Sequence, residues 1–250
     1  MSSERQNEIR YLLQEHGILT VTELAQRFNI SEMTIRRDLK SLATLGLIQR
    51  EHGRAIYPPV PPKDTLLMMR MGEAEREKAR IGRLAASLIS EGDSIILDAG
   101  TTTLAIAQAL NTKCTVITNS LPIASVLGNL DEITLLLTGG EVRNGTFALV
   151  GPMARDVFKG FNADKLFLGA TGVNLERGLS TSNMLESEVK QAMLEVAKEV
   201  ILVAHSAKIG QVSFHTFALW DRVQTLVTDS GLPTSIRAEL KSMGINVLIS

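Results

Sequence analysis

The segment Asp98-Ala-Gly-Thr-Thr-Thr103 carries the residue types best suited to binding an anion. It lies between an apolar run at residues 95–97 and a helical stretch at 104–110. A glycine and three hydroxyls at a strand-to-helix turn offer backbone N–H groups, side-chain donors and the positive end of a helix dipole. The Asp98 carboxylate would repel a phosphate, so we expect it to hold loop amides or sugar hydroxyls. The pattern also suits a capped helix without a ligand, and it has neither Walker nor dinucleotide-loop spacing.

Small polar residues follow the next apolar runs in the same way. Thr118-Asn-Ser120 and Thr138-Gly-Gly140 each come directly after a run, and Gly169 and Gly172 follow another. Because open α/β sheets bind ligands at the carboxyl ends of parallel strands, these residues would share one rim. Each segment alone is typical of a turn, whereas together they favour a pocket. The residues expected to form it are Asp98, Gly100, Thr101, Thr102, Thr103, Asn119, Ser120, Thr138, Gly139, Gly140 and Gly169.

A second group of candidate residues lies on one expected helix, residues 31–45. Ile35, Leu39 and Leu42 recur at i, i+4 and i+7, so they share the face that would pack inward. The opposite face carries three cations, and an arginine can bond guanine O6 and N7 or bind a phosphate. A solvated basic face is the alternative interpretation. The residues concerned are Met33, Thr34, Arg36, Arg37 and Lys40.

The elements that must position this face form a small unit, residues 1–57. Three helices are expected in it, the third capped by Ser31. Thr20 or Thr22 can cap the second helix, and Glu23 is placed to complete a capping box with Thr20. Two short strands should follow, at 47–50 and 55–57, around a turn at His52-Gly53. Two helices joined by a tight turn, with a hairpin after the third helix, predict a winged helix-turn-helix.

The clearest boundary in the chain is Pro58-Pro-Val-Pro-Pro62, which holds four of the seven prolines. Proline fixes φ and lacks an amide donor, so this segment should be a semi-rigid, extended spacer. We therefore expect a DNA-binding domain at 1–57, a connecting segment at 58–74 and an effector domain at 75–250.

The effector domain repeats short apolar runs separated by helical stretches, such as 77–90, 104–110 and 185–198. Continuous apolar strands that alternate with helices predict an α/β fold with a mostly parallel, Rossmann-like sheet covered on both faces. The expected strands are 94–98, 115–118, 133–137, 165–168, 200–204, 225–228 and 246–249.

Composition limits the class of protein. The chain has 250 residues, with 26 Lys plus Arg against 27 Asp plus Glu, so any nucleic-acid surface must be local. The single cysteine, Cys114, cannot form an internal disulfide, which favours a reducing, cytoplasmic setting. The charged N-terminal stretch has no signal-peptide pattern, and no apolar run is long enough to cross a bilayer.

The string Ser31-Glu-Met-Thr-Ile-Arg-Arg-Asp-Leu39, with Gly46-Leu-Ile-Gln-Arg50 after it, closely resembles the winged helix of the DeoR family of bacterial transcription regulators. The resemblance implies operator binding, usually as a repressor of a sugar-use operon. The family usually has His-Gly-Gly-Ala at the wing, whereas this chain has His52-Gly53-Arg54-Ala55. Arg54 would be strained if that position needs a positive φ, or it would contact phosphate or a minor groove. The residues expected at the DNA are Ser31, Met33, Thr34, Arg36, Arg37, Lys40, His52 and Arg54.

The resemblance extends through the effector domain, where Asp98-x-Gly-Thr-Thr-Thr103 and Lys208 match the family's sensor domain. That domain is similar in fold to ribose-phosphate isomerases and amino-sugar-phosphate deaminases. The resemblance implies that a phosphorylated sugar or related metabolite binds there and weakens operator binding. Where the family usually has Asp-Ser-Ser-Lys, this chain has His205-Ser-Ala-Lys208. With no acid between His205 and Lys208, we expect a pocket that tolerates more negative charge, such as a bisphosphate or phosphorylated sugar acid.

The expected helix at 185–198 also carries several charges. Its simplest interpretation is a solvated face with Glu186, Glu188, Lys190 and Glu195. Glu186 and Lys190 match family positions, however, and could border the pocket.

Two other functions fit less of the sequence. An isomerase- or deaminase-like enzyme could use Asp98, Glu186, His205 and Lys208 as acid and base, but it has no need of a winged helix. A pure oligomerisation module would bind no effector. We expect no catalytic activity and no cofactor. We also expect no metal, because the histidines share no ligand spacing with Cys114. The expected partners are double-stranded operator DNA, a phosphorylated-sugar effector and further copies of the chain in a dimer or tetramer, and an activator role stays open.

Overall fold

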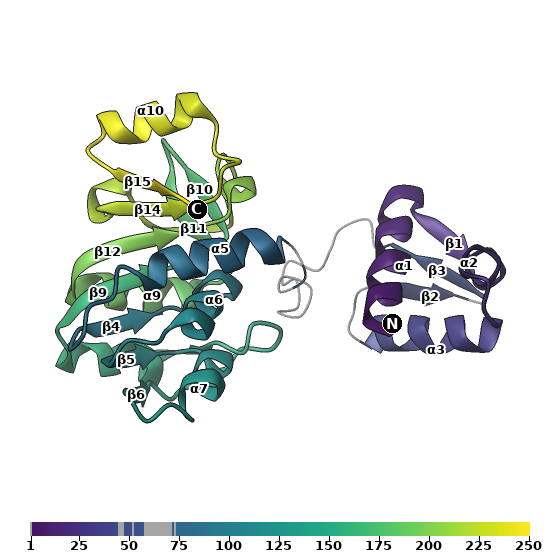
Figure 1. The fold of residues 1–250 in the computed structure, drawn as a ribbon, viewed down its shortest axis with the longest axis horizontal. Helices are drawn as coiled ribbons and strands as arrows, with labels where there is room; N and C mark the ends of the chain where they lie inside the picture. Colours follow the sequence, from purple (N-terminus) through teal and green to yellow (C-terminus); the bar gives the residue numbers. More distant parts are fainter. Residues whose placement is uncertain (1, 45–47, 52, 58–71, 73) are drawn as a thin grey trace. The chain divides into compact units, whose positions relative to one another are not determined.

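The computed structural model describes residues 2–44, 48–51, 53–57, 72 and 74–250 (Figure 1). The chain divides into two compact units, Met1–Met69 and Arg70–Ser250, and each is described by itself. The connecting segment expected at 58–74 falls almost wholly outside the described residues.

In the described residues of the N-terminal unit, three helices and a small sheet pack around one core. Ile35, Leu39 and Leu42 are buried in this core together with Ile9 and Leu13, which confirms the predicted inward face of the third helix. The elements of this unit are α1 (Ser2–His16), β1 (Ile18–Thr20), α2 (Val21–Phe28), α3 (Glu32–Thr44), β2 (Gln49–Glu51) and β3 (Arg54–Ile56).

Local hydrogen bonds and backbone geometry fix both ends of α2, and with them the turn from α2 to α3. Thr20 caps α2, since its Oγ1 accepts from Glu23 N at 3.1 Å and Glu23 Oε2 accepts from Thr20 N at 2.7 Å. This confirms the capping box and selects Thr20 over Thr22. Asn29 ends α2 with a φ of 51°, in the left-handed region that asparagine tolerates. The chain can therefore turn sharply and begin α3 at Glu32.

The sheet of this unit has three strands, whereas the sequence predicted a two-stranded hairpin. β1 pairs antiparallel with β3, and Ile18 lies opposite Ile56. The order is β1-β3-β2, so the wing strand β3 is central rather than at an edge. The prediction missed β1 because three residues between Gly17 and a helix cap carry no periodic signal.

The larger unit is built on a seven-stranded, wholly parallel sheet (Figure 1). Its order is β15-β14-β12-β9-β4-β5-β6. These are the seven apolar runs that the sequence predicts as strands. Their bounds are β4 (Ser94–Leu97), β5 (Cys114–Thr118), β6 (Ile133–Leu137), β9 (Ala163–Leu168), β12 (Ala197–Val203), β14 (Thr225–Thr228) and β15 (Asn246–Ile249).

Helices cover both faces of this sheet, as predicted. Within β4, Ile95 enters the core that contains Ile81 and Ile106, whereas Ile96 enters the core that contains Val189. Successive side chains of the strand thus point to opposite faces of the sheet and pack into different cores. The helices are α5 (Glu75–Ala86), α6 (Thr101–Ala109), α7 (Leu121–Leu127), α8 (Pro152–Asp156), α9 (Met184–Val196) and α10 (Thr234–Ser242), with 3-10 turns η1 (Val157–Gly160), η2 (Ser206–Lys208) and η3 (Trp220–Arg222).

Two small antiparallel sheets complete this unit, and the sequence did not predict them. One joins β10 (Gly172–Asn174), β11 (Gly178–Thr181) and β13 (His215–Ala218), and its Val173 and Phe217 share the core of Val189. The other joins β7 (Glu141–Val142) to β8 (Leu149–Val150). Strands of two to four residues are too short for an alternating pattern to stand out.

Candidate functional site

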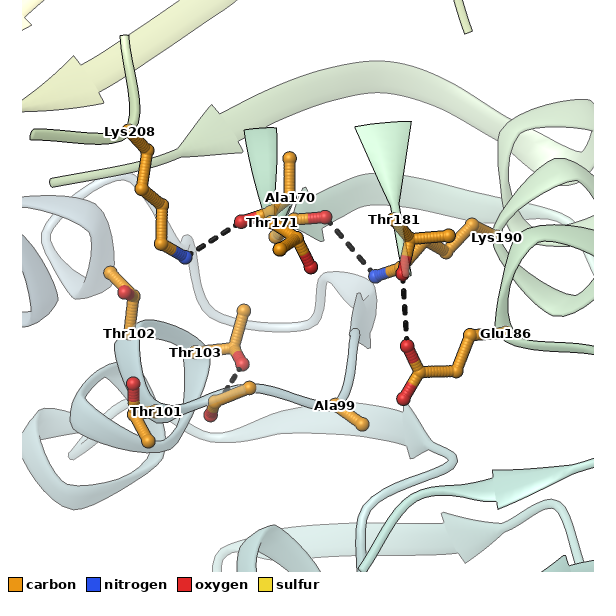
Figure 2. Close-up of a pocket in the computed structure, with 12 residues that line it drawn as sticks. Ala99, Thr101, Thr102, Thr103, Ala170, Thr171, Thr181, Glu186, Lys190 and Lys208 are labelled. Carbon is orange, nitrogen blue, oxygen red and sulfur yellow. Dashed lines mark hydrogen bonds between the residues drawn. The ribbon is translucent and has the colours of Figure 1, made fainter. Parts of the chain in front are cut away.

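The order of the strands reverses between β4 and β9. From β4 the sheet continues through β5 to β6, and from β9 it continues the other way through β12. The loops that leave β4 and β9 therefore diverge, and such a crevice is where open α/β sheets bind ligands. A small cavity that opens to solvent lies there (Figure 2). It is lined by Ala99, Gly100, Thr101, Thr102, Thr103, Gly169, Ala170, Thr171, Thr181, Glu186, Lys190 and Lys208.

The first turn of α6 forms one wall of this cavity. The first N–H groups of a helix have no partner within it and carry the positive end of its dipole. Thr103 Oγ1 donates to Gly100 O at 2.9 Å, which fixes the turn. Thr102 is 3% exposed, and its Oγ1 has no hydrogen-bond partner among the described residues. An unsatisfied buried hydroxyl costs about 1–3 kcal/mol, so its place in a cavity wall points to a ligand that bonds it.

Lys208 reaches the same cavity from η2. Its Nζ donates to Ala170 O at 2.6 Å, which ties η2 to the loop after β9 (Figure 2). The cavity thus offers an ammonium group, a hydroxyl and a helix N-terminus, the combination expected for an anion.

Glu186 and Lys190, on α9, line the cavity on the side away from Thr101 and Thr102 (Figure 2). Their side chains are 12% and 6% exposed, so the interpretation of a solvated face is wrong for both. Glu186 Oε1 accepts from Arg143 Nη1 at 2.6 Å, and its Oε2 accepts from Thr181 Oγ1 at 3.0 Å. Burial alone would raise the pKa of Glu186, but the nearby cations Lys190 and Arg143 outweigh it and hold the pKa below its ordinary value.

Asp98 lies directly behind this wall. Its Oδ2 accepts from Lys190 Nζ and from Gly169 N, the latter at 2.9 Å, while Lys190 Nζ also donates to Gly169 O at 3.1 Å. Complete burial raises the pKa of Asp98, and the Lys190 ammonium opposes that rise. Asp98 holds a loop amide, as expected, but it is not among the residues that line the cavity.

Five further residues expected at this cavity do not line it: Asn119, Ser120, Thr138, Gly139 and Gly140. Asn119 Oδ1 accepts from Ala99 N at 3.0 Å, so it positions a lining residue. Ser120 Oγ accepts from Ile123 N and caps α7. A Cβ on Gly140 would lie 2.7 Å from Val150 O, so this glycine permits close packing on β8.

His205 also lies outside the cavity lining. Its Nε2 is 3.7 Å from Asp229 Oδ1, and Asp229 Oδ2 accepts from Ser206 Oγ at 2.7 Å. An acid therefore lies beside His205, and the expectation of a pocket with extra tolerance for negative charge loses its basis.

Sequence reasoning missed four lining residues, Ala99, Ala170, Thr171 and Thr181. Ala99 and the pair Ala170-Thr171 lie two to three residues after the ends of β4 and β9, so the carboxyl-end rule that selected Gly100 and Gly169 could have included them. Thr181 belongs to β11, which no sequence signal indicated.

The exposed face of α3 is the second candidate site. Arg36, Arg37 and Lys40 are exposed there, as predicted, and Arg50 of β2 lies beside them. Arg50 is an addition that only the fold reveals. The residues bordering this surface are Met33, Thr34, Arg36, Arg37, Lys40 and Arg50.

Hydrogen bonds tie this face to α2 and α1. Arg36 Nη2 donates to Glu32 Oε2 at 3.1 Å, and Thr22 Oγ1 donates to Glu32 Oε1 at 2.7 Å, which joins α2 to α3. Ser31 Oγ accepts from Thr34 N at 3.3 Å, so Ser31 caps α3 as predicted. On the inner side, Arg5 Nε donates to the buried Asp38 at 2.6 Å and fastens α1 to α3.

Arg54 is exposed in β3, opposite Glu51 and Thr20. Among the described residues, the non-glycine residues with positive φ are Asn29, Ala74 and Phe147. The strained backbone considered for Arg54 is therefore wrong, and the positive φ, of 80°, is found at Gly53. His52 lies outside the described residues.

The part of the chain that the structure describes lacks two kinds of feature. It contains no cluster of three His, Cys, Asp or Glu side chains arranged to hold a metal ion. It also contains no helix with the length and apolar character that a bilayer span requires.

The chain matches two family models. Residues 5–59 match the DeoR-like helix-turn-helix domain, and residues 73–230 match the DeoR C terminal sensor domain. The HTH-type transcriptional repressor GlcR of Bacillus subtilis is 35% identical over 249 residues, which cover 99% of this chain and 96% of that protein. The HTH-type transcriptional regulator GlpR of Haloferax volcanii is 36% identical over 251 residues, covering 99% and 98%.

A solved structure of ribose 5-phosphate isomerase A from Methanocaldococcus jannaschii aligns with a TM-score of 0.41 and 17% identity, over 55% of each chain. The full-length sorbitol operon regulator SorC from Klebsiella pneumoniae aligns with a TM-score of 0.39 and 16% identity, over 89% of this chain and 94% of that one.

Proposed function

The chain belongs to the DeoR family of transcriptional regulators, and we propose that it represses a carbohydrate-use operon until a phosphorylated sugar or related metabolite releases it from the operator. Its N-terminal unit is the DNA-binding domain and its larger unit is the sensor domain. Relatives that match along the whole chain are named transcriptional regulators, which favours regulation over isomerase-like catalysis.

The exposed face of α3 supports the DNA-binding half of this proposal. Arg36, Arg37 and Lys40 share that face with Arg50 from β2. Cations on a helix that enters the major groove can bind phosphates and base edges. The patch is small, so one unit alone would bind weakly, and two units on paired half-sites would gain affinity.

The observation that carries the effector half is the buried Thr102 hydroxyl, which lines the cavity without a partner among the described residues. We place an anionic group of the effector against this hydroxyl, the first turn of α6 and Lys208. An anion there gains the helix dipole and the ammonium together.

The α9 side of the cavity limits what else the effector can carry. Glu186 is a carboxylate with a lowered pKa, and the Lys190 ammonium is already in contact with Asp98. A second phosphate at this side would face a carboxylate, whereas sugar hydroxyls could donate to it. The arrangement favours a monophosphate with free hydroxyls over a bisphosphate.

Release from DNA requires the effector to bind the DNA-free arrangement more tightly than the DNA-bound one. We propose that two or more chains associate through the sensor domain and present paired DNA-binding domains. Effector binding would fix the first turn of α6 against the loop after β9 and favour a spacing that no longer matches the half-sites. Coupling of about 1–3 kcal/mol would change operator affinity by roughly 5- to 150-fold.

The test is fluorescence anisotropy with full-length protein and the DNA upstream of its own gene, repeated with single phosphorylated sugars. We expect salt-dependent, sequence-selective binding that a sugar monophosphate abolishes and its unphosphorylated form does not. Tighter binding with the sugar phosphate would contradict release by the effector, because the two ligands would then favour the same arrangement. Selective binding that no sugar phosphate alters would contradict the proposed effector, and turnover of ribose 5-phosphate would contradict the regulator-only assignment.

A further inference from the structure

Met33 is an apolar side chain on a surface that otherwise carries several cations. It lies in the first turn of α3, and its exposed fraction is 77%. Four cations border the same surface, at Arg36, Arg37, Lys40 and Arg50. Met33 is therefore the apolar member of a face otherwise suited to a polyanion.

The core of this unit does not use Met33. The inward face of α3 is formed by Ile35, Leu39 and Leu42, and all three are buried. Single exposed apolar residues are common on proteins, so exposure alone carries no argument. The place of Met33 at the start of α3 is the evidence for a function, because the first residues of a recognition helix reach base edges in the major groove.

The major groove offers one apolar group, the C5-methyl of thymine. A methionine side chain is unbranched and polarisable, so it can adapt to a methyl group whose exact position varies. We propose that Met33 recognises a thymine methyl in each half-site and is a specificity-determining residue of the operator complex. This inference rests on the proposed DNA-binding function.

Neighbouring contacts would fix where this thymine lies. Arg36 and Arg37 follow Met33 at i+3 and i+4, so they share its side of the helix. Arg36 is held by Glu32, which Thr22 holds in turn. The thymine should therefore lie next to a base pair or phosphate that Arg36 or Arg37 contacts, rather than at the edge of the half-site.

The experiment uses full-length protein and the tightest duplex that it selects from a randomised DNA library. Each thymine of one half-site is replaced singly by deoxyuridine, which removes only the methyl group and keeps every hydrogen-bonding atom. We expect one replacement to weaken wild-type binding about fourfold, the factor for one buried methyl group, and the others to have smaller effects. Met33→Ala should bind the thymine and deoxyuridine duplexes equally well.

Two control proteins accompany this series. Met33→Leu keeps an apolar contact and should keep a preference for thymine. Met153→Ala removes another exposed methionine, 68% exposed and in the sensor domain, and should behave as wild type. Melting curves would show that each variant is folded.

Three outcomes would overturn the inference. The first is that wild type binds every deoxyuridine duplex as tightly as the unmodified duplex. The second is an undiminished thymine preference in Met33→Ala, and the third is a selected half-site without thymine. Each of them leaves the regulator proposal intact, because selection itself demonstrates sequence-specific binding. Failure to select any duplex over bulk DNA would instead overturn both proposals.

Discussion

Arg143 Nη1 lies 2.6 Å from Glu186 Oε1, and this ion pair joins the β7–β8 hairpin to the wall of the sensor cavity. Both side chains are largely buried, so the charge of each offsets the cost of removing the other charge from water. A residue of the cavity wall thus also determines how a neighbouring hairpin is held.

Glu186→Gln keeps the size of this side chain and removes its charge. We expect the free energy of unfolding to fall by about 1–3 kcal/mol, because Arg143 keeps a hydrogen-bond acceptor but loses its counter-charge. Chemical denaturation at neutral pH measures this loss. An unchanged midpoint would show that the ion pair contributes no net stability.

The loss should depend on pH. The pKa of Glu186 is lowered in the folded protein, so its contribution is fully present above the ordinary glutamate pKa and is lost as the pH falls through the folded value. The difference in unfolding free energy between wild type and Glu186→Gln should therefore shrink as the pH drops below about 4.5. A constant difference from pH 7 to pH 3 would contradict this assignment.

Thr102→Val and Thr103→Val form a matched pair in the first turn of α6. Thr102→Val removes a buried hydroxyl without a partner in the described structure, so thermal stability should stay equal or rise. The effector concentration needed to release DNA should nevertheless increase about tenfold or more, since a hydrogen bond to a charged group contributes about 1.5–3 kcal/mol.

Thr103→Val should show the opposite pattern, with lower thermal stability but a smaller change in the effector concentration needed to release DNA. The Thr103 hydroxyl donates to Gly100 O, so its removal should cost about 1 kcal/mol of stability. Differential scanning calorimetry and anisotropy on both variants separate the two roles. Equal effector sensitivity in wild type and Thr102→Val would remove the main support for the anion site.

Arg37→Ala should weaken operator binding and leave effector binding unchanged. Arg37 is exposed on the α3 face. Loss of one phosphate contact should make the negative slope of log K against log salt shallower by about one. Anisotropy at several salt concentrations measures that slope. Arg237→Ala, an exposed helix position in the sensor domain, is the control and should keep the wild-type slope.

Asp38→Asn should impair DNA binding without any contact between residue 38 and DNA. Asp38 is 1% exposed and accepts from Arg5 Nε at 2.6 Å, so it fastens α1 to the recognition helix. We expect the N-terminal unit to lose about 1–3 kcal/mol and to melt earlier. Near-normal melting combined with lost binding would instead place Asp38 in the interface.

Cys114 should resist alkylation in the folded protein. Burial and the nearby Asp93 raise the pKa of its thiol to about 11. The reactive thiolate is then about a thousandth of the population at pH 8. Iodoacetamide should modify the folded chain far more slowly than the chain in denaturant, and similar rates would show that β5 opens readily.

Local patterns made the main architecture predictable. The i, i+4, i+7 spacing of Ile35, Leu39 and Leu42 defines both faces of α3 from within thirteen residues. The seven strands of the large sheet were predictable because each is a continuous apolar run between turn residues.

The cavity wall on α9 was not predictable in the same way. Glu186 and Lys190 are spaced like an exposed ion pair, and nothing nearby in the sequence shows that they are buried. Their partners, Arg143 and Asp98, lie 43 and 92 positions away. The prediction that Thr138-Gly-Gly140 lines the cavity was wrong for a related reason. Gly140 packs against Val150, which lies on another strand, rather than facing the cavity.

The reversal of strand order between β4 and β9 also affects how the chain folds as it is synthesised. Ile95 pairs with Lys165, about seventy positions later, so the edge of β4 has no partner while the intervening chain is made. At about 5–20 residues per second, that interval lasts roughly 4–14 s. An uncovered strand edge can pair with another nascent chain. Since Gly169 and Lys208, which line the cavity, are synthesised later still, a metabolite bound in that cavity cannot stabilise this stage.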